Sequence, residues 1–243
     1  MNDDRKIPWK RISVEAVAIV ASILLAFAID ASWEDRQANT NRRDLIRGLT
    51  SDFESLVERA DKALAITDDI VARNQKLLEL LASGDGTGLE DLKRLLSSFF
   101  ESSGRLRTSL PILDTALGAE GLGSIDDSAF FRAVRDFQDE RENYDRLVRL
   151  SAEIFYRDLG PYYRQRFGTI AVLRGEYSSF SDTSYSYPAE FALTADQIIE
   201  EFRKPELFGR LEHRYNTNRN IRLFISSIRE AARSVLQALK EIA

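Results

Sequence analysis

The most apolar stretch of the chain runs from Ile12 to Ile29, and Glu15 is the one charged residue among its eighteen positions. As an α-helix rising about 1.5 Å per residue, this run spans roughly 27 Å, close to the ~30 Å hydrocarbon core of a bilayer. Trp9 and Trp33 bracket the run at the separation of two membrane interfaces. The pattern predicts a tail over residues 1–11, a transmembrane helix over 12–30 and an extramembrane domain over 31–243.

The charges on either side of the run predict its orientation. Four basic residues precede it, whereas Arg36 is the only basic residue among the eleven that follow Asp30. Because basic residues favour the cytoplasmic side, we expect a cytoplasmic N-terminus and a periplasmic domain on a bacterial inner membrane. The residues expected at the membrane interface are Trp9, Lys10, Arg11 and Trp33.

A cleavable signal peptide is the competing interpretation, because Ala26-Phe27-Ala28 has the small-x-small form of a cleavage site behind a basic start. The apolar run is longer than a usual signal core and contains Glu15. These two features favour a retained anchor.

Glu15 has two interpretations. It lies about one helical turn from Lys10 and Arg11, where it can pair with a cation or be solvated. Alternatively, it contacts a donor on a neighbouring membrane helix, since a charge inside a bilayer costs several kcal/mol and is usually partnered. Small side chains allow such an approach, and the predicted helix contact comprises Glu15, Ala18 and Ser22.

Beyond the run, apolar residues recur at alternating steps of three and four, the spacing of helices packed in a bundle or coiled coil. Three long stretches carry this pattern: residues 46–81, 130–162 and 208–242. Shorter helices are expected over 89–100 and 109–117, and Thr194 to Gln197 forms a capping box. We therefore predict an all-α fold: the N-terminal helix continues into an elongated antiparallel bundle of three helices of around forty residues, and the short helices cap one end.

An aromatic segment over residues 175–191 lies between the last two long patterns. Its tyrosines and phenylalanines alternate with serines, a composition typical of adaptable recognition surfaces. The alternative is a loop fixed to the bundle end by its own aromatic side chains. If the protein contacts a partner here, the candidate residues are Tyr177, Phe180, Tyr185 and Tyr187.

The composition restricts the kinds of catalytic or metal-binding site that the chain can form. The net charge of −5 argues against nucleic acid as a ligand, and the absence of cysteine excludes disulfides and thiolate metal sites. His213 is the single histidine, so histidine-based catalysis or metal binding has one possible centre at most. We expect no catalytic residues, no metal site and no cofactor.

Two segments resemble a known family. They are the anchor led by Glu15, with its exit Ile29-Asp-Ala-Ser-Trp33-Glu, and the turn from Ala116 through Gly121 to Ile125. Together they resemble a family of uncharacterised bacterial single-pass membrane proteins with a helical extramembrane domain. The chain departs from that family in lacking a glycine inside the anchor and an Asn-Asn pair before the tryptophan. The resemblance implies the architecture and no mechanism.

The early glutamate in an apolar helix also resembles type IV pilins, although Lys10-Arg11 stands where their processing site has glycine.

We expect a non-enzymatic accessory or stabilising subunit of a larger membrane complex, for example a respiratory or photosynthetic one. Its expected partners are membrane lipid and other subunits or further copies of itself. The alternatives are a periplasmic ligand-sensing receptor domain and a pilin-like filament subunit.

Overall fold

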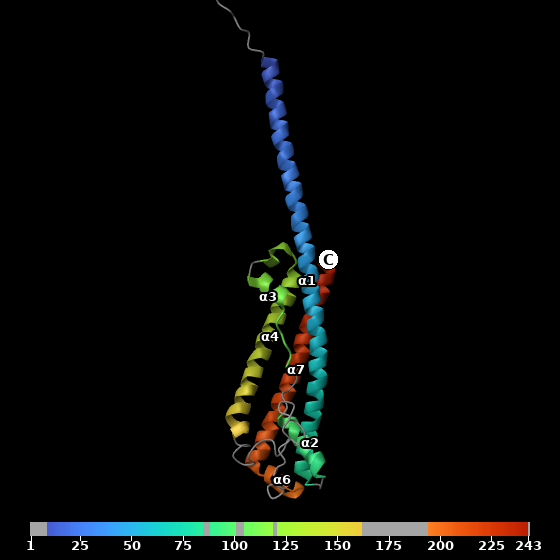
Figure 1. Ribbon diagram of the computed structural model, residues 1–243, viewed down its shortest axis with the longest axis vertical. Helices are drawn as coiled ribbons and strands as arrows, with labels where there is room; N and C mark the ends of the chain where they lie inside the picture. Colours follow the sequence, from blue (N-terminus) through green and yellow to red (C-terminus); the bar gives the residue numbers. More distant parts are fainter. Residues whose placement is uncertain (1–8, 85–87, 101–104, 119–120, 162–193, 243) are drawn as a thin grey trace, which may run out of the picture.

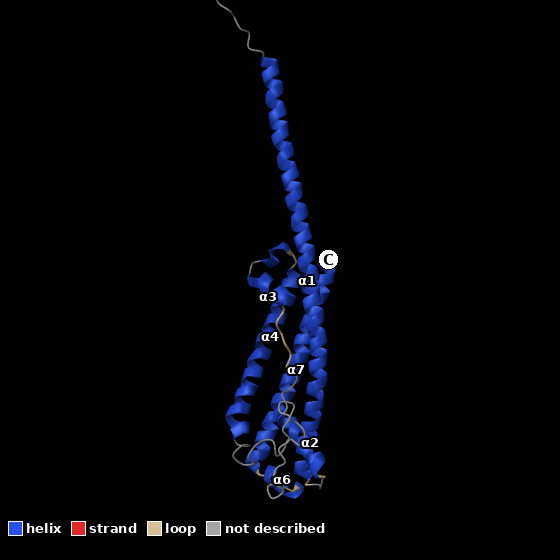
Figure 2. Cartoon of the chain, viewed as in Figure 1, coloured by secondary structure: helices blue, strands red, loops and turns tan. Residues whose placement is uncertain are grey.

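The computed structural model describes residues 9–84, 88–100, 105–118, 121–161 and 194–242. Within these ranges, nothing is described for the side chains of residues 9–21, 28, 90, 93, 97, 100, 158 and 159. The described part is helical and holds no strand, which confirms the all-α prediction (Figure 2). Its elements are α1 (Trp9–Ser83), α2 (Leu89–Phe100), α3 (Pro111–Gly118), η1 (Gly121–Ser124), α4 (Ser128–Ile154), η2 (Phe155–Leu159), α6 (Ala195–Phe202) and α7 (Pro205–Ile242).

Three long helices, α1, α4 and α7, form an elongated bundle (Figure 1). Helix α7 runs antiparallel to the other two, as expected, but α1 and α4 run parallel to each other. The reason lies in the connection between them, which returns along the bundle through α2, an extended segment over 105–110, and α3. Helical periodicity does not encode direction, so the sequence pattern did not reveal this return.

The short helices occupy both ends of the bundle, so the prediction that they cap one end is wrong. Helices α2 and α6 lie beside the C-terminal end of α1, whereas α3 and η1 lie at the opposite end, near the C-terminus (Figure 1). Helix α1 has 75 residues because the N-terminal helix continues into the bundle, as predicted, and α7 has 38, close to the expected forty, whereas α4 has only 27. Helix α4 is short because a π-helical turn, η2, follows it at Phe155.

Individual boundaries follow local chemistry. Helix α1 ends at Ser83 because Gly84 adopts a left-handed φ of 75°, which glycine tolerates without strain. The predicted capping box at Thr194 and Gln197 is present at the start of α6. Asp127 caps α4 by accepting a hydrogen bond from the backbone nitrogen of Phe130 at 2.6 Å.

Helices α1 and α7 are aligned by a ladder of polar contacts spaced seven residues apart. Arg229 Nη1 contacts Asp61 Oδ1 at 3.0 Å, Arg222 bonds Asp68, and the Tyr215 hydroxyl donates to Gln75 Oε1 at 3.4 Å. Each step of seven along α1 matches a step of seven back along α7. The two helices therefore keep one antiparallel heptad register along the ladder.

The buried core divides into two apolar clusters. The proximal cluster, nearer the N-terminal part of α1, includes Leu49, Phe53, Leu56, Leu110, Leu113, Phe130, Phe137, Tyr144, Ile225, Ile228 and Val235. The distal cluster, at the opposite end, comprises Leu77, Leu81, Leu92, Leu95, Leu96, Phe99, Ile198, Ile199, Phe202, Leu207 and Leu211. The α1 side chains in both clusters occupy the positions predicted from the heptad spacing.

Helix α1 continues well beyond the bundle as a single helix (Figure 1). Among the described residues, no helix has a stretch that is both long and apolar enough to cross a membrane. The membrane helix expected over 12–30 therefore has no support from the described part of the chain. Most of that range, residues 12–21 and 28, has side chains outside the described part.

Candidate functional site

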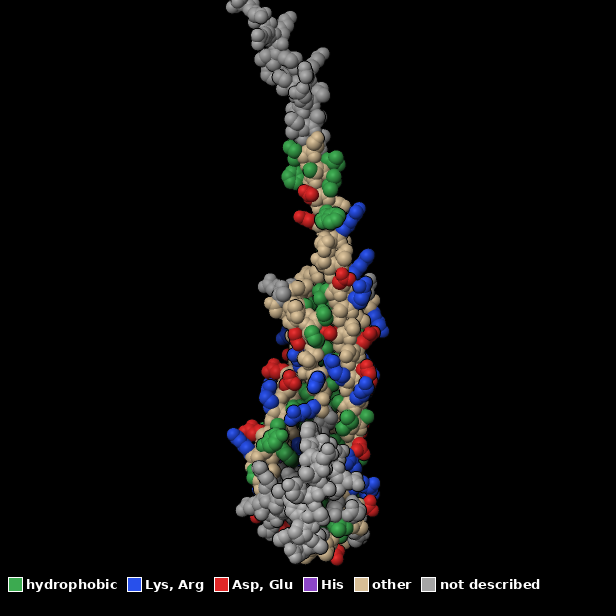
Figure 3. Space-filling view, viewed as in Figure 1, with side chains coloured by type: hydrophobic (Ala, Val, Ile, Leu, Met, Phe, Trp, Pro, Cys, Tyr) green, Lys and Arg blue, Asp and Glu red, His purple; other side chains and the backbone are tan. Residues whose placement is uncertain are grey.

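The most distinctive surface is on the part of α1 that projects from the bundle, and we call residues 22–33 the apolar segment. Its large side chains are exposed by half or more: Ile23 50%, Leu24 63%, Leu25 63%, Phe27 67%, Ile29 59% and Trp33 70%. Successive residues of an α-helix point about 100° apart, so these side chains surround the helix. Figure 3 shows apolar side chains on the face of this segment that is in view. A helix that is apolar on all sides is characteristic of a buried or lipid-facing environment.

A polar stalk, residues 34–41, joins the apolar segment to the bundle, and every one of its side chains is exposed. Gln37 donates to Asn41 Oδ1 at 3.1 Å, and the Thr40 hydroxyl donates to the Arg36 carbonyl at 2.9 Å, so the stalk's contacts are local. The bundle starts at Arg42, whose Nη2 reaches the Ile242 carbonyl at 3.4 Å. The apolar surface therefore changes to a solvated one within a single turn.

Some of the residues expected at the membrane have described side chains, and the others do not. Trp33 and Ser22 are exposed on α1. The side chains of Trp9, Lys10, Arg11, Glu15 and Ala18 lie outside the described part, although their backbone belongs to α1. The aromatic segment with Tyr177, Phe180, Tyr185 and Tyr187 also lies outside the described residues.

A second unusual region separates the two apolar clusters, and we call it the polar layer. On α1, the buried positions between Leu64 and Leu77 are Thr67, Ile70 and Asn74; on α7, those between Leu211 and Ile221 are Arg214, Thr217 and Asn218. Ile70 is the one apolar side chain in this set. Two further buried polar residues join the layer from other helices, namely Ser98 of α2 and Ser151 of α4.

Arg214 connects α7 to α4 inside this layer. Its Nη1 donates to Ser151 Oγ at 2.7 Å, and its guanidinium carbon lies 5.5 Å from the centre of the Phe155 ring, a cation–π distance. Burial lowers the pKa of the guanidinium to about 10, because the charged form loses hydration. The side chain thus stays protonated at neutral pH within the bundle.

The asparagines of the layer have incomplete hydrogen bonding. The Ser98 hydroxyl donates to Asn74 Oδ1 at 2.6 Å. No described group bonds Asn74 Nδ2 or either amide atom of Asn218, and both residues are fully buried. The sequence held a signal for this layer: on α7 the three-four spacing lapses between Tyr215 and Ile221, and on α1 it includes Thr67 and Asn74. The polar layer was not among the features predicted from the sequence.

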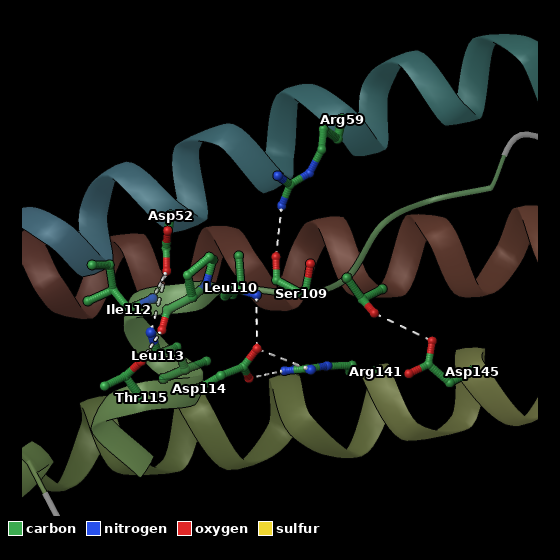
Figure 4. A network of polar contacts seen from close by, with 12 residues as sticks. Asp52, Arg59, Ser109, Leu110, Ile112, Leu113, Asp114, Thr115, Arg141 and Asp145 are labelled. Carbon is green, nitrogen blue, oxygen red and sulfur yellow. Dashed lines mark hydrogen bonds and ion pairs between the residues drawn. The ribbon is translucent and has the colours of Figure 1, made fainter. Parts of the chain in front are cut away.

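A third network fixes α3 and the extended segment over 105–110 between α1 and α4 (Figure 4). Asp52 of α1 accepts hydrogen bonds from the backbone nitrogens of Ile112 and Leu113 at 2.8 and 3.4 Å. Asp114 accepts from Arg141 of α4 at 2.6 Å. Burial raises the pKa of Asp114, but the hydrogen bonds from Arg141 and the Leu110 backbone, together with the Arg141 charge, outweigh it and lower the pKa overall. This network is structural: each charged group is matched within it.

Other candidate chemistry is sparse in the described part of the chain. No group of three histidine, aspartate or glutamate side chains there is placed to hold a metal ion. A shallow depression of about 230 Å³ on α4 is lined by Gln138, Arg141, Glu142, Asp145 and Arg149. Two of these residues, Arg141 and Asp145, already belong to the network that holds the extended segment and α3.

Comparison with known proteins gives no match: no family model, no curated protein and no solved structure is similar to this chain.

Proposed function

We propose that this chain is a non-catalytic, single-pass membrane protein whose helical bundle acts as an accessory or stabilising subunit of a larger membrane complex. The apolar segment carries the proposal, because Leu24, Leu25 and Phe27 are all more than half exposed on the part of α1 that projects from the bundle. Sequestering such side chains from water contributes about 1.5–3 kcal/mol each. Lipid supplies that environment around the full circumference of a single helix.

The residues before the apolar segment extend this argument. In the sequence, the apolar run begins at Ile12 and is long enough, with residues 22–29, to match a bilayer. Trp33 stands at its end, followed by the charged Glu34 and Asp35, as at a membrane interface. The excess of basic residues before Ile12 supports a cytoplasmic N-terminus, with the bundle in the periplasm of a bacterium.

The subunit part of the proposal rests on the architecture of the bundle. The described ion pairs between helices, such as Asp61 with Arg229 and Asp114 with Arg141, align helices with each other. Arg141 also lines the shallow depression on α4, but its guanidinium is engaged there by Asp114 of α3. A rod of packed helices on a membrane anchor is suited to lying beside other subunits and holding them in place.

Membrane insertion can be tested on the full chain with two matched double variants. In Leu24→Arg/Phe27→Arg, two charges enter the apolar segment, and each costs about 2.5–3.5 kcal/mol at the centre of a membrane helix. In the control, Gln37→Arg/Asn41→Arg, the same number of arginines is added to the stalk. We expect the wild type and the control to resist extraction by alkaline carbonate, and the first variant to be extracted. Extraction of the wild type would overturn the anchor.

The subunit role is tested by purifying the chain from native membranes in mild detergent and measuring its mass. A stable assembly larger than one chain, with reproducible stoichiometry, would support the proposal. A monomer without any partner would overturn the subunit role while leaving the anchor intact. Glu15→Gln separates the two interpretations of Glu15: loss of the assembly indicates an intramembrane contact, and an unchanged assembly leaves the interface pairing.

A further inference from the structure

We propose that the polar layer divides the bundle into two parts that open independently. The distal part comprises α2, α6 and the adjoining ends of α1 and α7, and it opens while the proximal part stays folded. Opening uncovers the apolar side chains of the distal cluster at the end of the bundle farthest from the stalk. This conformational step does not depend on the proposed membrane anchor.

The division of the core is the first support. Burial of apolar side chains is the main interaction that stabilises a helical bundle. Within each cluster these side chains contact one another without a break. Between the clusters, Ile70 is the only apolar side chain among the buried α1 and α7 positions. Few apolar contacts between buried side chains of α1 and α7 therefore connect one cluster to the other.

Unmet hydrogen bonds are the second support. Both amide atoms of Asn218 and the Nδ2 atom of Asn74 lack a described partner while fully buried. A buried polar group without a partner is destabilising, and it recovers its hydrogen bonds when water reaches it. Opening at this layer is therefore favoured over opening inside either cluster.

The two parts are also held together differently. In the proximal part, α3 and the extended segment are tied to α1 and α4 by Asp52, Asp114 and Arg141. A buried hydrogen bond from the Leu106 nitrogen to the Tyr144 hydroxyl, 2.9 Å long, adds to this. At the start of the distal part, α4 changes to the π-helical turn at Phe155, and Tyr156 beside it is 67% exposed. Among the described residues, the distal end of α4 is joined to α7 by the polar side chain of Arg214, which contacts Ser151 and Phe155.

Hydrogen exchange on the full chain in detergent micelles, followed by mass spectrometry, tests the proposal. We expect amides in α2, α6 and residues 207–213 to exchange at least tenfold faster than amides in residues 49–64 and 225–239. We also expect the distal amides to share one rate that responds to low urea before the proximal amides do. A single common rate for both parts would overturn the proposal.

Asn218→Leu should join the two clusters, because it replaces an unsatisfied amide with an apolar side chain of similar size. We expect distal exchange to slow about tenfold and to approach the proximal rate. The matched control is Asn220→Leu, the same change on the exposed face of α7, which should leave the ratio of the two rates unchanged. Equal effects of the two variants would contradict the role of the layer.

A cross-link provides a test in which the same variant before cross-linking is the reference, because Tyr215 packs against the distal cluster. The chain has no cysteine, so Gln75→Cys/Tyr215→Cys can be joined selectively by a short bismaleimide across α1 and α7. The matched pair, Asp61→Cys/Arg229→Cys, lies at the equivalent rung of the ladder in the proximal part. We expect the first cross-link to slow distal exchange and the second to leave it unchanged. The reverse result, or no effect from either, would overturn the proposal.

Discussion

Arg214 is a buried cation, and its burial should make the free energy of unfolding depend on pH. The folded protein disfavours the protonated guanidinium, whose pKa falls to about 10. For a base with a lowered pKa in the folded state, the unfolded chain binds more protons between the two pKa values. Stability therefore rises with pH across that interval and is constant below it. In Arg214→Lys, the same burial acts on an amine with an ordinary pKa of about 10.4.

We expect the lysine of Arg214→Lys to titrate well below its ordinary pKa. The free energy of unfolding of this variant should rise by about 1–3 kcal/mol between roughly pH 7 and pH 10, whereas the wild type shows no such rise from Arg214. Urea unfolding followed by circular dichroism measures the difference. The matched control is Arg233→Lys at an exposed position of α7. Identical pH profiles for the two variants would contradict the burial effect.

Asp52 is a carboxylate on one helix that caps the first turn of another. Because it accepts from the Ile112 and Leu113 nitrogens, Asp52→Ala leaves both donors without their acceptor. We expect the free energy of unfolding to fall by about 1–2 kcal/mol, the usual effect of losing a helix cap. The control Glu54→Ala removes an exposed carboxylate two residues along α1, and an equal loss there would argue against capping.

At the scale of elements, the ladder between α1 and α7 sets register more than stability. Asp68 and Arg222 are both about half exposed, and exposed ion pairs contribute about 0.2–1 kcal/mol. We expect Asp68→Arg and Arg222→Asp each to lower stability by up to about 1 kcal/mol, and the double swap to recover most of it. The four proteins should be unfolded in low and in high salt, because salt should weaken the interaction between residues 68 and 222. A double variant as unstable as the sum of the singles would contradict the pairing.

The elements divide clearly into those that the sequence predicts and those that it does not. The heptad positions of α1 and the capping box of α6 are local patterns, and both are confirmed. The parallel course of α1 and α4 depends on the extended segment over 105–110, which alternates exposed Arg105 and Arg107 with buried Leu106 and Thr108. Six residues of such alternation do not stand out among helical patterns.

The candidate site also has one part that the sequence predicts and one that it does not. The apolar segment can be recognised in the sequence as a run of apolar residues. The polar layer does not, because Thr67 and Asn74 have the spacing of core residues, and only the packed helices reveal that Arg214, Ser151 and Ser98 meet them. The polar residues that meet in the layer come from four helices and share no common spacing in the sequence.

At the scale of the whole molecule, α1 sets the distance between the proposed membrane anchor and the bundle. Its helix is continuous from Trp9 to Ser83, so the stalk of residues 34–41 spans about 12 Å at 1.5 Å per residue. A partner subunit that contacts both the membrane helix and the bundle must match this distance. The length of the stalk is therefore a specific requirement of the subunit hypothesis and not of an isolated anchored bundle.

Lengthening the stalk tests this requirement. Seven helix-forming residues inserted after Gln37 raise the bundle by about 10 Å and turn it by only about 20°, so nearly the same face is presented. We expect the bundle to remain folded, with an unchanged urea midpoint, while the native assembly is lost when purified in mild detergent. The same seven residues added after Ala243 serve as the control and should leave the assembly intact. An assembly that tolerates the longer stalk would show that the partner contacts the membrane helix or the bundle, but not both.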